Sequence, residues 1–173
     1  VVIHYARSAD KAQAVVAGIE AAGGRAIALQ ADLGDVAAIR RLFAEASERL
    51  GGLDIVVNNA GVADYKPRTA VTEEDFAATF DVNARGTFFA LQEAARRVRE
   101  GGRIISISTG ATVGASPYAS IYCGSKAAVE QFIQLTAHEY AAFGVRANTV
   151  VPGLIDTPRI ANTVAKMFNA DDL

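Results

Sequence analysis

The sequence RIISIS at residues 103–108 is an apolar run with small hydroxyl residues, and it predicts a buried β-strand. A loop of small residues follows at 109–120, and the next 23 residues, 121–143, predict a helix with few breakers. On that helix Tyr122 and Lys126 are four positions apart, so their side chains share one face. In an open α/β sheet, ligands bind outside the carboxyl ends of the strands. We therefore expect a phenol, an amine and the hydroxyls at the end of the strand to gather at one ligand site.

These groups point to acid–base chemistry on an oxygen atom. A free phenol has a pKa of about 10, and a nearby ammonium lowers that value by favouring the phenolate. Such a phenol can donate a proton to a developing alkoxide or remove one from an alcohol. A hydroxyl at Ser108 or Thr109 would hold the carbonyl oxygen in line. The set suits the interconversion of a carbonyl and an alcohol, with the hydride carried by a cofactor.

The rest of the chain alternates between predicted strands and helices. Asp35 is expected to cap one helix, and Thr72 with Asp75 forms a predicted capping box at another. The helix that follows this box is expected to bend near 83–86. The alternation predicts an α/β fold, a doubly wound parallel sheet with helices on both faces, in which residues 1–173 form a single domain. The predicted strands are 1–5, 25–30, 55–57, 103–108 and 145–151, and the predicted helices are 9–22, 36–50, 73–99 and 121–143.

Several motifs occur together in a fixed order. They are Asn58-Asn59-Ala60-Gly61, then Asn83 with Gly86, the Ser/Thr pair at 108–109, Tyr122 with Lys126, and Pro152-Gly153 followed by Thr157. With these motifs, the sequence resembles the short-chain dehydrogenase/reductase family over essentially its whole length, and 3-oxoacyl carrier-protein reductases within it. The resemblance implies a Rossmann-like fold in which residues 1–5 are the second strand of the sheet. We therefore expect the first βα unit, with its glycine-rich phosphate loop, and the C-terminal end to lie outside this chain.

The resemblance also implies roles for the catalytic residues. Tyr122 would be the acid and base, and Lys126 would lower its pKa and bind the nicotinamide ribose. Thr109, thirteen residues before the tyrosine, stands where the family has a serine and would orient the carbonyl oxygen, with Ser108 as the alternative. Asn83 would bend its helix so that its backbone carbonyl holds a water that leads to the lysine.

The predicted cofactor site begins at the end of the first strand. Arg7 and Ser8 stand there in place of the carboxylate that selects NAD, and a guanidinium suits a 2′-phosphate, so we expect NADP(H) rather than NAD(H). Alternatively, Arg7 is a solvated residue at the start of a helix. Asp32 with the backbone of Leu33 would position the adenine, or Asp32 is only a turn residue. The other cofactor-binding residues implied by the resemblance are Asn59, Ala60, Gly61, Pro152, Gly153, Ile155 at the carboxamide and Thr157 near the phosphates.

Composition excludes several classes of function. A net charge of −2 and a pI near 5.7 do not fit a nucleic-acid surface, and no apolar stretch is long enough for a membrane span. His4 and His138 are far apart in the sequence and predict no metal site. The single cysteine, Cys123, excludes a disulfide within the chain and fits a reducing compartment such as the cytoplasm.

We therefore predict an NADP(H)-dependent oxidoreductase that acts on a small-molecule ketone or a 3-oxoacyl compound. One alternative is an epimerase or dehydratase that uses the same tyrosine and lysine with a retained NAD. Another is a non-catalytic nucleotide sensor or scaffold. The resemblance further implies a homo-oligomer, a dimer or tetramer, built on the helix at 121–143 and the helix before it.

Overall fold

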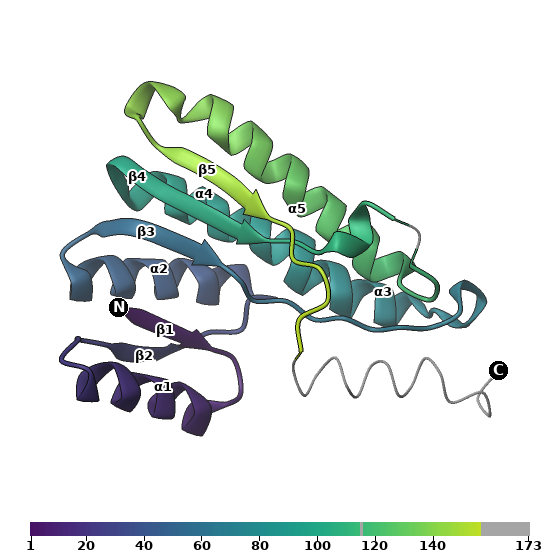
Figure 1. The fold of residues 1–173 in the computed structure, drawn as a ribbon, viewed down its shortest axis with the longest axis horizontal. Helices are drawn as coiled ribbons and strands as arrows, with labels where there is room; N and C mark the ends of the chain where they lie inside the picture. The colour runs from purple at the N-terminus through teal and green to yellow at the C-terminus, as the bar shows by residue number, and fades with distance from the viewer. Residues whose placement is uncertain (115, 157–173) are drawn as a thin grey trace.

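The computed structural model describes residues 1–114 and 116–156, and in this part strands and helices alternate along the chain (Figure 1). The strands are β1 (Val2–Tyr5), β2 (Ile27–Gln30), β3 (Leu53–Asn58), β4 (Val98–Ile107) and β5 (Arg146–Val150). The α-helices are α1 (Ala9–Ala21), α2 (Val36–Leu50), α3 (Glu73–Phe80), α4 (Thr87–Arg97) and α5 (Ser120–Glu139).

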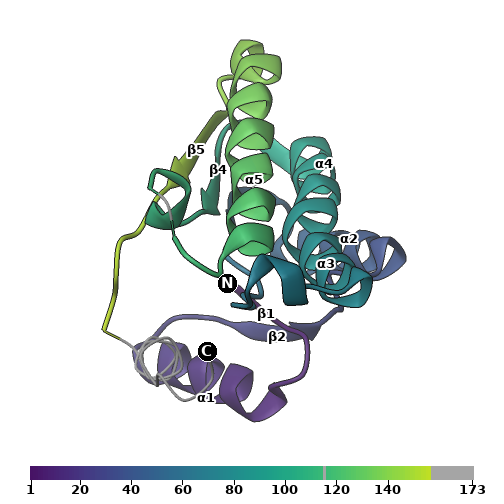
Figure 2. The ribbon, with the colours of Figure 1, turned by 90° about the vertical axis from the view of Figure 1, so that its right-hand side faces the viewer.

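All strand pairs are parallel. β1 pairs with β2, and β4 lies between β3 and β5, with Ile55 opposite Arg103 and Ile105 opposite Asn148 in the register. Figure 2 shows α1 on the other side of β1 and β2 from α2, α4 and α5. The parallel strands with helices on both faces confirm the predicted doubly wound fold.

An apolar cleft of about 940 Å³ separates the β1–β2 sheet from the β3–β4–β5 sheet. β1 and β3 line it from opposite sides, together with apolar residues of α2 and α4. The apolar side chains of β3 are open to it; Ile55, for example, is 63% exposed. β1 and β3 are parallel and lie on opposite sides of this cleft. A further parallel strand, as expected from the sequence for the additional βα unit, would need such a position.

The predicted helix caps are present. The Asp35 side chain accepts a hydrogen bond from Ala37 N (2.8 Å) at the start of α2, and Gly51 ends that helix with φ 70°. At the start of α3, Thr72 Oγ1 accepts from Asp75 N (3.1 Å) while Asp75 Oδ2 accepts from Thr72 N (3.0 Å). This reciprocal pair is the predicted capping box.

The long helical region predicted at 73–99 is present and ends two residues earlier than predicted. A single π-helical turn, Asp81–Gly86, separates α3 from α4, and α4 ends at Arg97 so that residues 98–99 begin β4. Gly86 lets this turn pack against another segment, because a Cβ there would lie 2.4 Å from the Leu33 carbonyl oxygen. The π turn is therefore the predicted bend near 83–86.

Other boundaries differ by a few residues. The helix predicted at 121–143 ends at Glu139, and a 3₁₀ turn, Ala141–Phe143, leads to Gly144 with φ 66°. The second strand begins at Ile27 rather than at Arg25. Such shifts are common where helices and strands fray at their ends.

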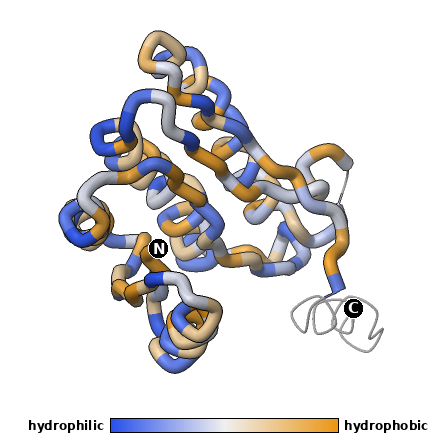
Figure 3. Tube along the Cα trace, turned by 60° about the vertical axis from the view of Figure 1, so that its left-hand side comes forward, coloured by the Kyte–Doolittle hydropathy of each residue, from blue (hydrophilic) through white to orange (hydrophobic). Residues whose placement is uncertain are grey.

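The main core lies between the β3–β4–β5 sheet and the helices α2, α4 and α5. Figure 3 shows hydrophobic and hydrophilic residues alternating along the helices, so each helix has an apolar face. The buried residues of this core are Leu33, Ile39, Phe43, Ala46, Leu53, Ala90, Leu91, Ala94, Ile104, Ile133, Val145 and Ala147.

Candidate active site

Asn83 lies at the centre of the site, in the π turn, and its side chain is fully buried. Its Oδ1 accepts from Val62 N (2.8 Å), and its Nδ2 lies within hydrogen-bonding distance of Val62 O (2.7 Å) and Ser125 Oγ (3.0 Å). These bonds join the loop after β3 to the first half of α5. The side chain therefore fixes the distance between two segments that both carry predicted site residues.

Gly61 makes room for the lysine of the site. A Cβ at this position would lie 3.1 Å from Asn83 Oδ1 and 3.2 Å from Lys126 Nζ. Lys126 is 6% exposed, and its Nζ donates to the Ile107 carbonyl oxygen at 2.8 Å. The ammonium is therefore held between the end of β4 and the loop after β3. From the sequence we expected this glycine to admit the cofactor, and the structure adds its contact with the lysine.

The two hydroxyl residues after β4 differ in their surroundings. Ser108 is buried and its Oγ bonds to Glu130 Oε1 at 2.5 Å. Thr109 is half-buried, and its Oγ1 accepts from Ala111 N at 3.3 Å. Accepting a bond uses a lone pair, so the Thr109 hydroxyl keeps a proton to donate. Of the two hydroxyls, that of Thr109 is the more accessible to a ligand.

Tyr122 is half-buried in the first turn of α5, one turn before Lys126. Its ring lies 6.0 Å from that of Tyr65, centroid to centroid, at an angle of 50°. The backbone beside Tyr65 is tied to the loop before α5, because Lys66 N donates to Tyr118 O at 2.9 Å. Sequence reasoning missed Tyr65, since it lies in an irregular loop where no periodicity shows which way a side chain points.

The asparagines after β3 have different environments. The Nδ2 of Asn58 lies 3.0 Å from Thr87 Oγ1 and 3.3 Å from Ser106 Oγ, so it connects β3 to α4 and β4. Asn59 is exposed and Ala60 is half-buried, so the Asn59 side chain is open to solvent or to a ligand.

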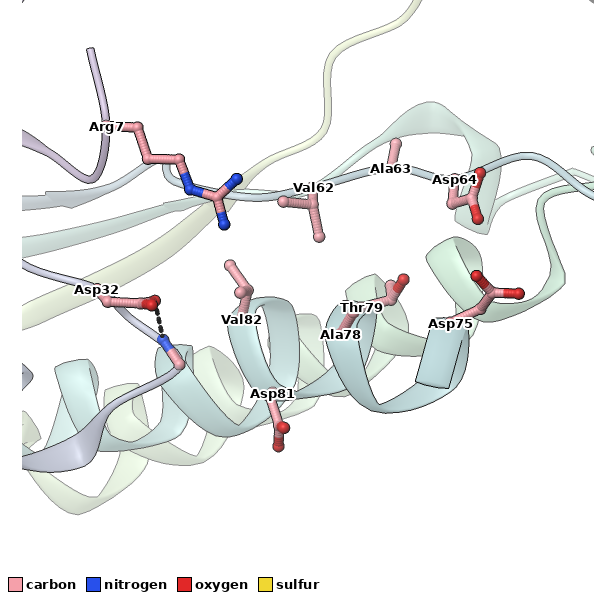
Figure 4. Close-up of a pocket in the computed structure, with 11 residues that line it drawn as sticks. Arg7, Asp32, Val62, Ala63, Asp64, Asp75, Ala78, Thr79, Asp81 and Val82 are labelled. Carbon is pink, nitrogen blue, oxygen red and sulfur yellow. Dashed lines mark hydrogen bonds between the residues drawn. The ribbon is translucent and has the colours of Figure 1, made fainter. Parts of the chain in front are cut away.

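A cavity of about 390 Å³ lies beyond the ends of β1 and β2 (Figure 4). Arg7 extends its guanidinium into this cavity toward Val62 and Val82, and it is the only cation among the described residues that line it. Ser8 is exposed at the start of α1, and its side chain makes no capping bond there. The full lining is Arg7, Asp32, Gly34, Val62, Ala63, Asp64, Asp75, Ala78, Thr79, Asp81 and Val82.

Asp32 and Leu33 occupy the turn after β2. Asp32 Oδ1 accepts from Gly34 N at 2.9 Å, so the aspartate is a turn residue and also lines the cavity. The Leu33 side chain is buried in the core, and its carbonyl oxygen lies against Gly86. The two readings of Asp32 that the sequence left open are therefore compatible.

The segment after β5 runs beside the loop that carries Thr109. Ser108 N donates to Val150 O at 2.8 Å, and Gly110 N donates to Pro152 O at 2.7 Å. Pro152 is half-buried, and Gly153 and Ile155 are exposed. Thr157, also predicted at the cofactor, lies outside the described residues.

A cluster of charges that the sequence did not single out stands near the far end of the cavity. Lys66 Nζ lies 2.6 Å from Asp75 Oδ1 and 3.3 Å from Asp64 Oδ2. The hydrogen bond to Asp75 raises the pKa of Lys66. The pKa of Asp75 is lowered, first by Lys66 and then by the Thr72 backbone N–H. This pair fixes the loop after β3 onto the start of α3.

Within residues 1–114 and 116–156, no group of three or more His, Cys, Asp or Glu side chains could hold a metal ion. In the same part of the chain, no helix combines the length and the apolar character that a membrane crossing requires.

The fold and the site together define a parallel α/β protein with a hydroxyl residue after β4 and a tyrosine and a buried lysine one turn apart on α5. The sequence profile of the family described as short chain dehydrogenase matches residues 1–167, and the chain belongs to this family. The short chain dehydrogenase/reductase AacuN of Aspergillus aculeatus is 42% identical over 171 residues, which cover 98% of this chain and 62% of AacuN. Versicolorin reductase 1 of Aspergillus parasiticus is 44% identical over 158 residues, covering 91% of this chain and 60% of that protein.

A solved structure gives the same result. A short chain dehydrogenase from Burkholderia cenocepacia in complex with NADP superimposes with a TM-score of 0.88 at 44% identity, covering 91% of this chain and 65% of that one. The chain thus spans less than two thirds of the length of these relatives.

Proposed function

We propose that this protein is an NADP(H)-dependent oxidoreductase that interconverts a carbonyl and an alcohol. The observation that carries the proposal is the buried Lys126 ammonium, which bonds to Ile107 O at 2.8 Å, two residues before Thr109, and follows Tyr122 by one turn of α5. Burial of a lysine ammonium costs free energy unless the charge is paired and hydrogen-bonded. Its fixed place beside Gly61 supports a functional role.

Each residue has a defined task in this proposal. The nicotinamide cofactor supplies or accepts the hydride when bound. The Tyr122 hydroxyl donates a proton to the oxygen that becomes the alcohol, and takes it back in the reverse direction. Lys126 provides positive charge near that phenol, and the Thr109 hydroxyl holds the carbonyl oxygen by a hydrogen bond. Asn83 keeps the loop at Val62 and α5 in place, so that these groups stay aligned.

We propose that the cofactor is NADP(H) rather than NAD(H). Arg7 extends into the cavity beyond β1 and β2, and no carboxylate stands at the end of β1 to bind a free ribose hydroxyl. A guanidinium binds a phosphate through two parallel hydrogen bonds, and the exposed Ser8 hydroxyl beside it can add a third. The NADP in the similar Burkholderia structure supports the same preference.

For the substrate we propose a ketone, with a ketone on a ring system ahead of a 3-oxoacyl compound. The Tyr65 ring beside Tyr122 offers an aromatic wall at the reacting end of the site. The similarity to versicolorin reductase 1 favours a reductase of this kind.

We also propose that the protein is a cytoplasmic homo-oligomer that forms through α4 and α5. Phe88 on α4 is 45% exposed and Leu135 on α5 is 49% exposed, so both helices carry apolar surface that a second copy of the chain would cover. Leu135→Arg would place a charge in that contact, so light scattering is expected to show a smaller assembly.

The function is tested by following oxidation of NADPH with the full-length protein and a panel of ring ketones, open-chain ketones and 3-oxoacyl esters. NADH is run in parallel, and Tyr122→Phe is the control because it keeps the ring and removes the proton. Turnover that prefers NADPH and falls about 10²- to 10⁴-fold in Tyr122→Phe supports the proposal. Binding of NADPH without turnover of any carbonyl would instead support a nucleotide sensor.

A further inference from the structure

The helix α5 carries a third polar residue on the face that holds Tyr122 and Lys126. Glu130 lies one turn beyond the lysine, so the three side chains follow one another at four-residue intervals. Glu130 Oε1 lies 2.5 Å from Ser108 Oγ and 2.7 Å from Thr112 Oγ1. The carboxylate thus reaches across to the loop that follows β4.

The two hydroxyls bonded to Glu130 stand on either side of Thr109. Ser108 precedes it, and Thr112 closes the 3₁₀ turn that begins after it. Thr112 Oγ1 also lies 2.9 Å from the Thr109 carbonyl oxygen, so the single Thr112 proton is shared between that carbonyl and Glu130. A single carboxylate oxygen therefore holds both ends of the segment that carries the Thr109 hydroxyl.

Backbone bonds hold the outer side of the same loop. Ser108 N and Gly110 N donate to the carbonyls of Val150 and Pro152. These bonds fix the main chain on the side of β5. On the side of α5, the Glu130 carboxylate accepts from the two hydroxyls and Cys123 Sγ donates to the Ala111 carbonyl oxygen at 3.3 Å. The two sets of contacts leave little freedom for the direction of the Thr109 side chain, whose Oγ1 already accepts from Ala111 N.

We propose that Glu130 is a positioning residue that sets the direction of the Thr109 hydroxyl through Ser108 and Thr112. The proposal rests on the proposed function, in which Thr109 bonds to the substrate oxygen. Hydrogen bonds from hydroxyls to a carboxylate are stronger than those between neutral groups, so they suit a part of the site that must not move. An acidic side chain at 130 thereby serves the reaction without touching the substrate.

The first test is a double-mutant cycle on kcat with Glu130→Ala and Thr109→Ala. Glu130→Ala is expected to lower kcat about 10- to 100-fold, since a small displacement of a reacting group has effects of that size. The Kd for NADPH is expected to stay within about twofold, because Arg7 and its cavity are on other elements. In the Thr109→Ala background, Glu130→Ala is expected to lower kcat no further, since the hydroxyl that it positions is gone.

The second test does not depend on turnover. Hydrogen exchange is measured at the amides of Ala111, Thr112 and Val113, which bond within the 3₁₀ turn, in the protein without cofactor. Glu130→Ala is expected to speed their exchange several-fold. Glu130→Gln is expected to restore both exchange and kcat in large part, because its amide oxygen still accepts from the two hydroxyls. Glu139→Ala, exposed at the end of α5, is the matched control and should change neither.

The outcomes separate this inference from the function. If Glu130→Ala lowers kcat by the same factor with and without Thr109, positioning through Thr109 is wrong. Unchanged exchange at 111–113 in Glu130→Ala would overturn it as well. If the wild-type protein reduces no carbonyl, the proposed function fails, and the exchange data alone decide whether Glu130 orders the loop.

Discussion

The β3–β4–β5 sheet and the β1–β2 sheet differ in what covers them and in how their polar groups are bonded. Every member of the main buried core lies at or after Leu33, so β1, α1 and β2 contribute none of it. The four residues of β1 are all half-buried, and α1 buries only Ala12 and Val16. The buried Asn83 side chain bonds to the loop after β3 and to α5, beside the larger sheet, whereas the smaller sheet is followed by the solvent-exposed Arg7.

This difference shows in which part of the molecule the side chains are held most firmly in position. Acid–base chemistry requires groups held within a few tenths of an ångström, and buried, fully bonded side chains provide that. Recognition of a phosphate tolerates a longer and more mobile arginine. The cleft between the sheets affects both of them, because within the described residues β1 has a strand partner only in β2 and β3 only in β4.

The largest effect is expected on the free energy of unfolding, when one isoleucine in each sheet is replaced by alanine. Ile104 in β4 is completely buried, and Ile3 in β1 is half-buried. Ile104→Ala is expected to lower the free energy of unfolding by about 2–5 kcal/mol, since it leaves a cavity in the core. Ile3→Ala should cost about 1 kcal/mol, because much of that side chain is already in contact with solvent. Urea unfolding measures both, and equal losses would contradict the contrast between the sheets.

The next largest effect on stability is expected from loss of the Asn83 hydrogen bonds. Asn83→Ala removes the side-chain partner of the Val62 N–H and C=O. It also removes one of the two partners of the Ser125 hydroxyl, which keeps its bond to Tyr122 O. We expect a loss of about 1–3 kcal/mol in the free energy of unfolding. Asn148→Ala is the matched control, because Asn148 is an exposed asparagine on β5 and its loss should cost less than about 0.5 kcal/mol. A loss in the Asn83 variant no larger than in the control would show that the network contributes nothing to stability.

The third effect is on cofactor choice and leaves stability unchanged. Arg7→Ala removes the guanidinium that extends into the cavity, so NADPH should bind about tenfold or more weakly while NADH binding stays the same. Isothermal titration with both cofactors gives the two Kd values, and Arg25→Ala, an exposed arginine in the same part of the chain, is the control. An equal loss for NADPH and NADH would assign Arg7 to a part of the cofactor that both share.

The elements that the sequence predicted best are those with strong local signals. Helix α2 matches its predicted bounds because Asp35 caps one end and Gly51 the other. The run at 103–108 matches the C-terminal half of the central strand β4, where buried and half-buried residues alternate. The Tyr122–Lys126 spacing placed both residues on one face of α5 from helical periodicity alone.

The features that sequence reasoning missed depend on contacts between distant segments. The bend near 83–86 was predicted, but the contact of Gly86 with Leu33, some fifty residues earlier, was not, because nothing local at Gly86 reveals that neighbour. Tyr65 meets Tyr122, and Glu130 meets Ser108 and Thr112, by the way that loops fold over α5. Periodicity fixes the face of a helix, but the partner on that face is a property of the tertiary fold.

The smallest effect on the free energy of unfolding is expected from substitutions at the N-terminal caps of α3 and α1. Thr72 has a complete capping box with Asp75, whereas Ser8 makes no side-chain cap. Thr72→Ala should therefore cost about 1 kcal/mol of unfolding free energy, and Ser8→Ala no more than a few tenths. Thermal unfolding of the two variants tests this, and a larger loss for Ser8→Ala would mean that the cap assignment is reversed.

The pH dependence of the α3 cap follows from the charges that hold it. Because the pKa of Asp75 is lowered in the folded protein, its contribution to stability is complete above the ordinary aspartate pKa of about 3.9 and is lost as pH falls through the folded value. The raised pKa of Lys66 makes its contribution complete below about 10.4, with loss only as pH rises beyond that. The difference in Tm between wild type and Asp75→Asn should thus be constant across neutral pH and shrink below about pH 4. A difference that persists unchanged at acid pH would show that Asp75 acts by its shape in the capping box and not by its charge on Lys66.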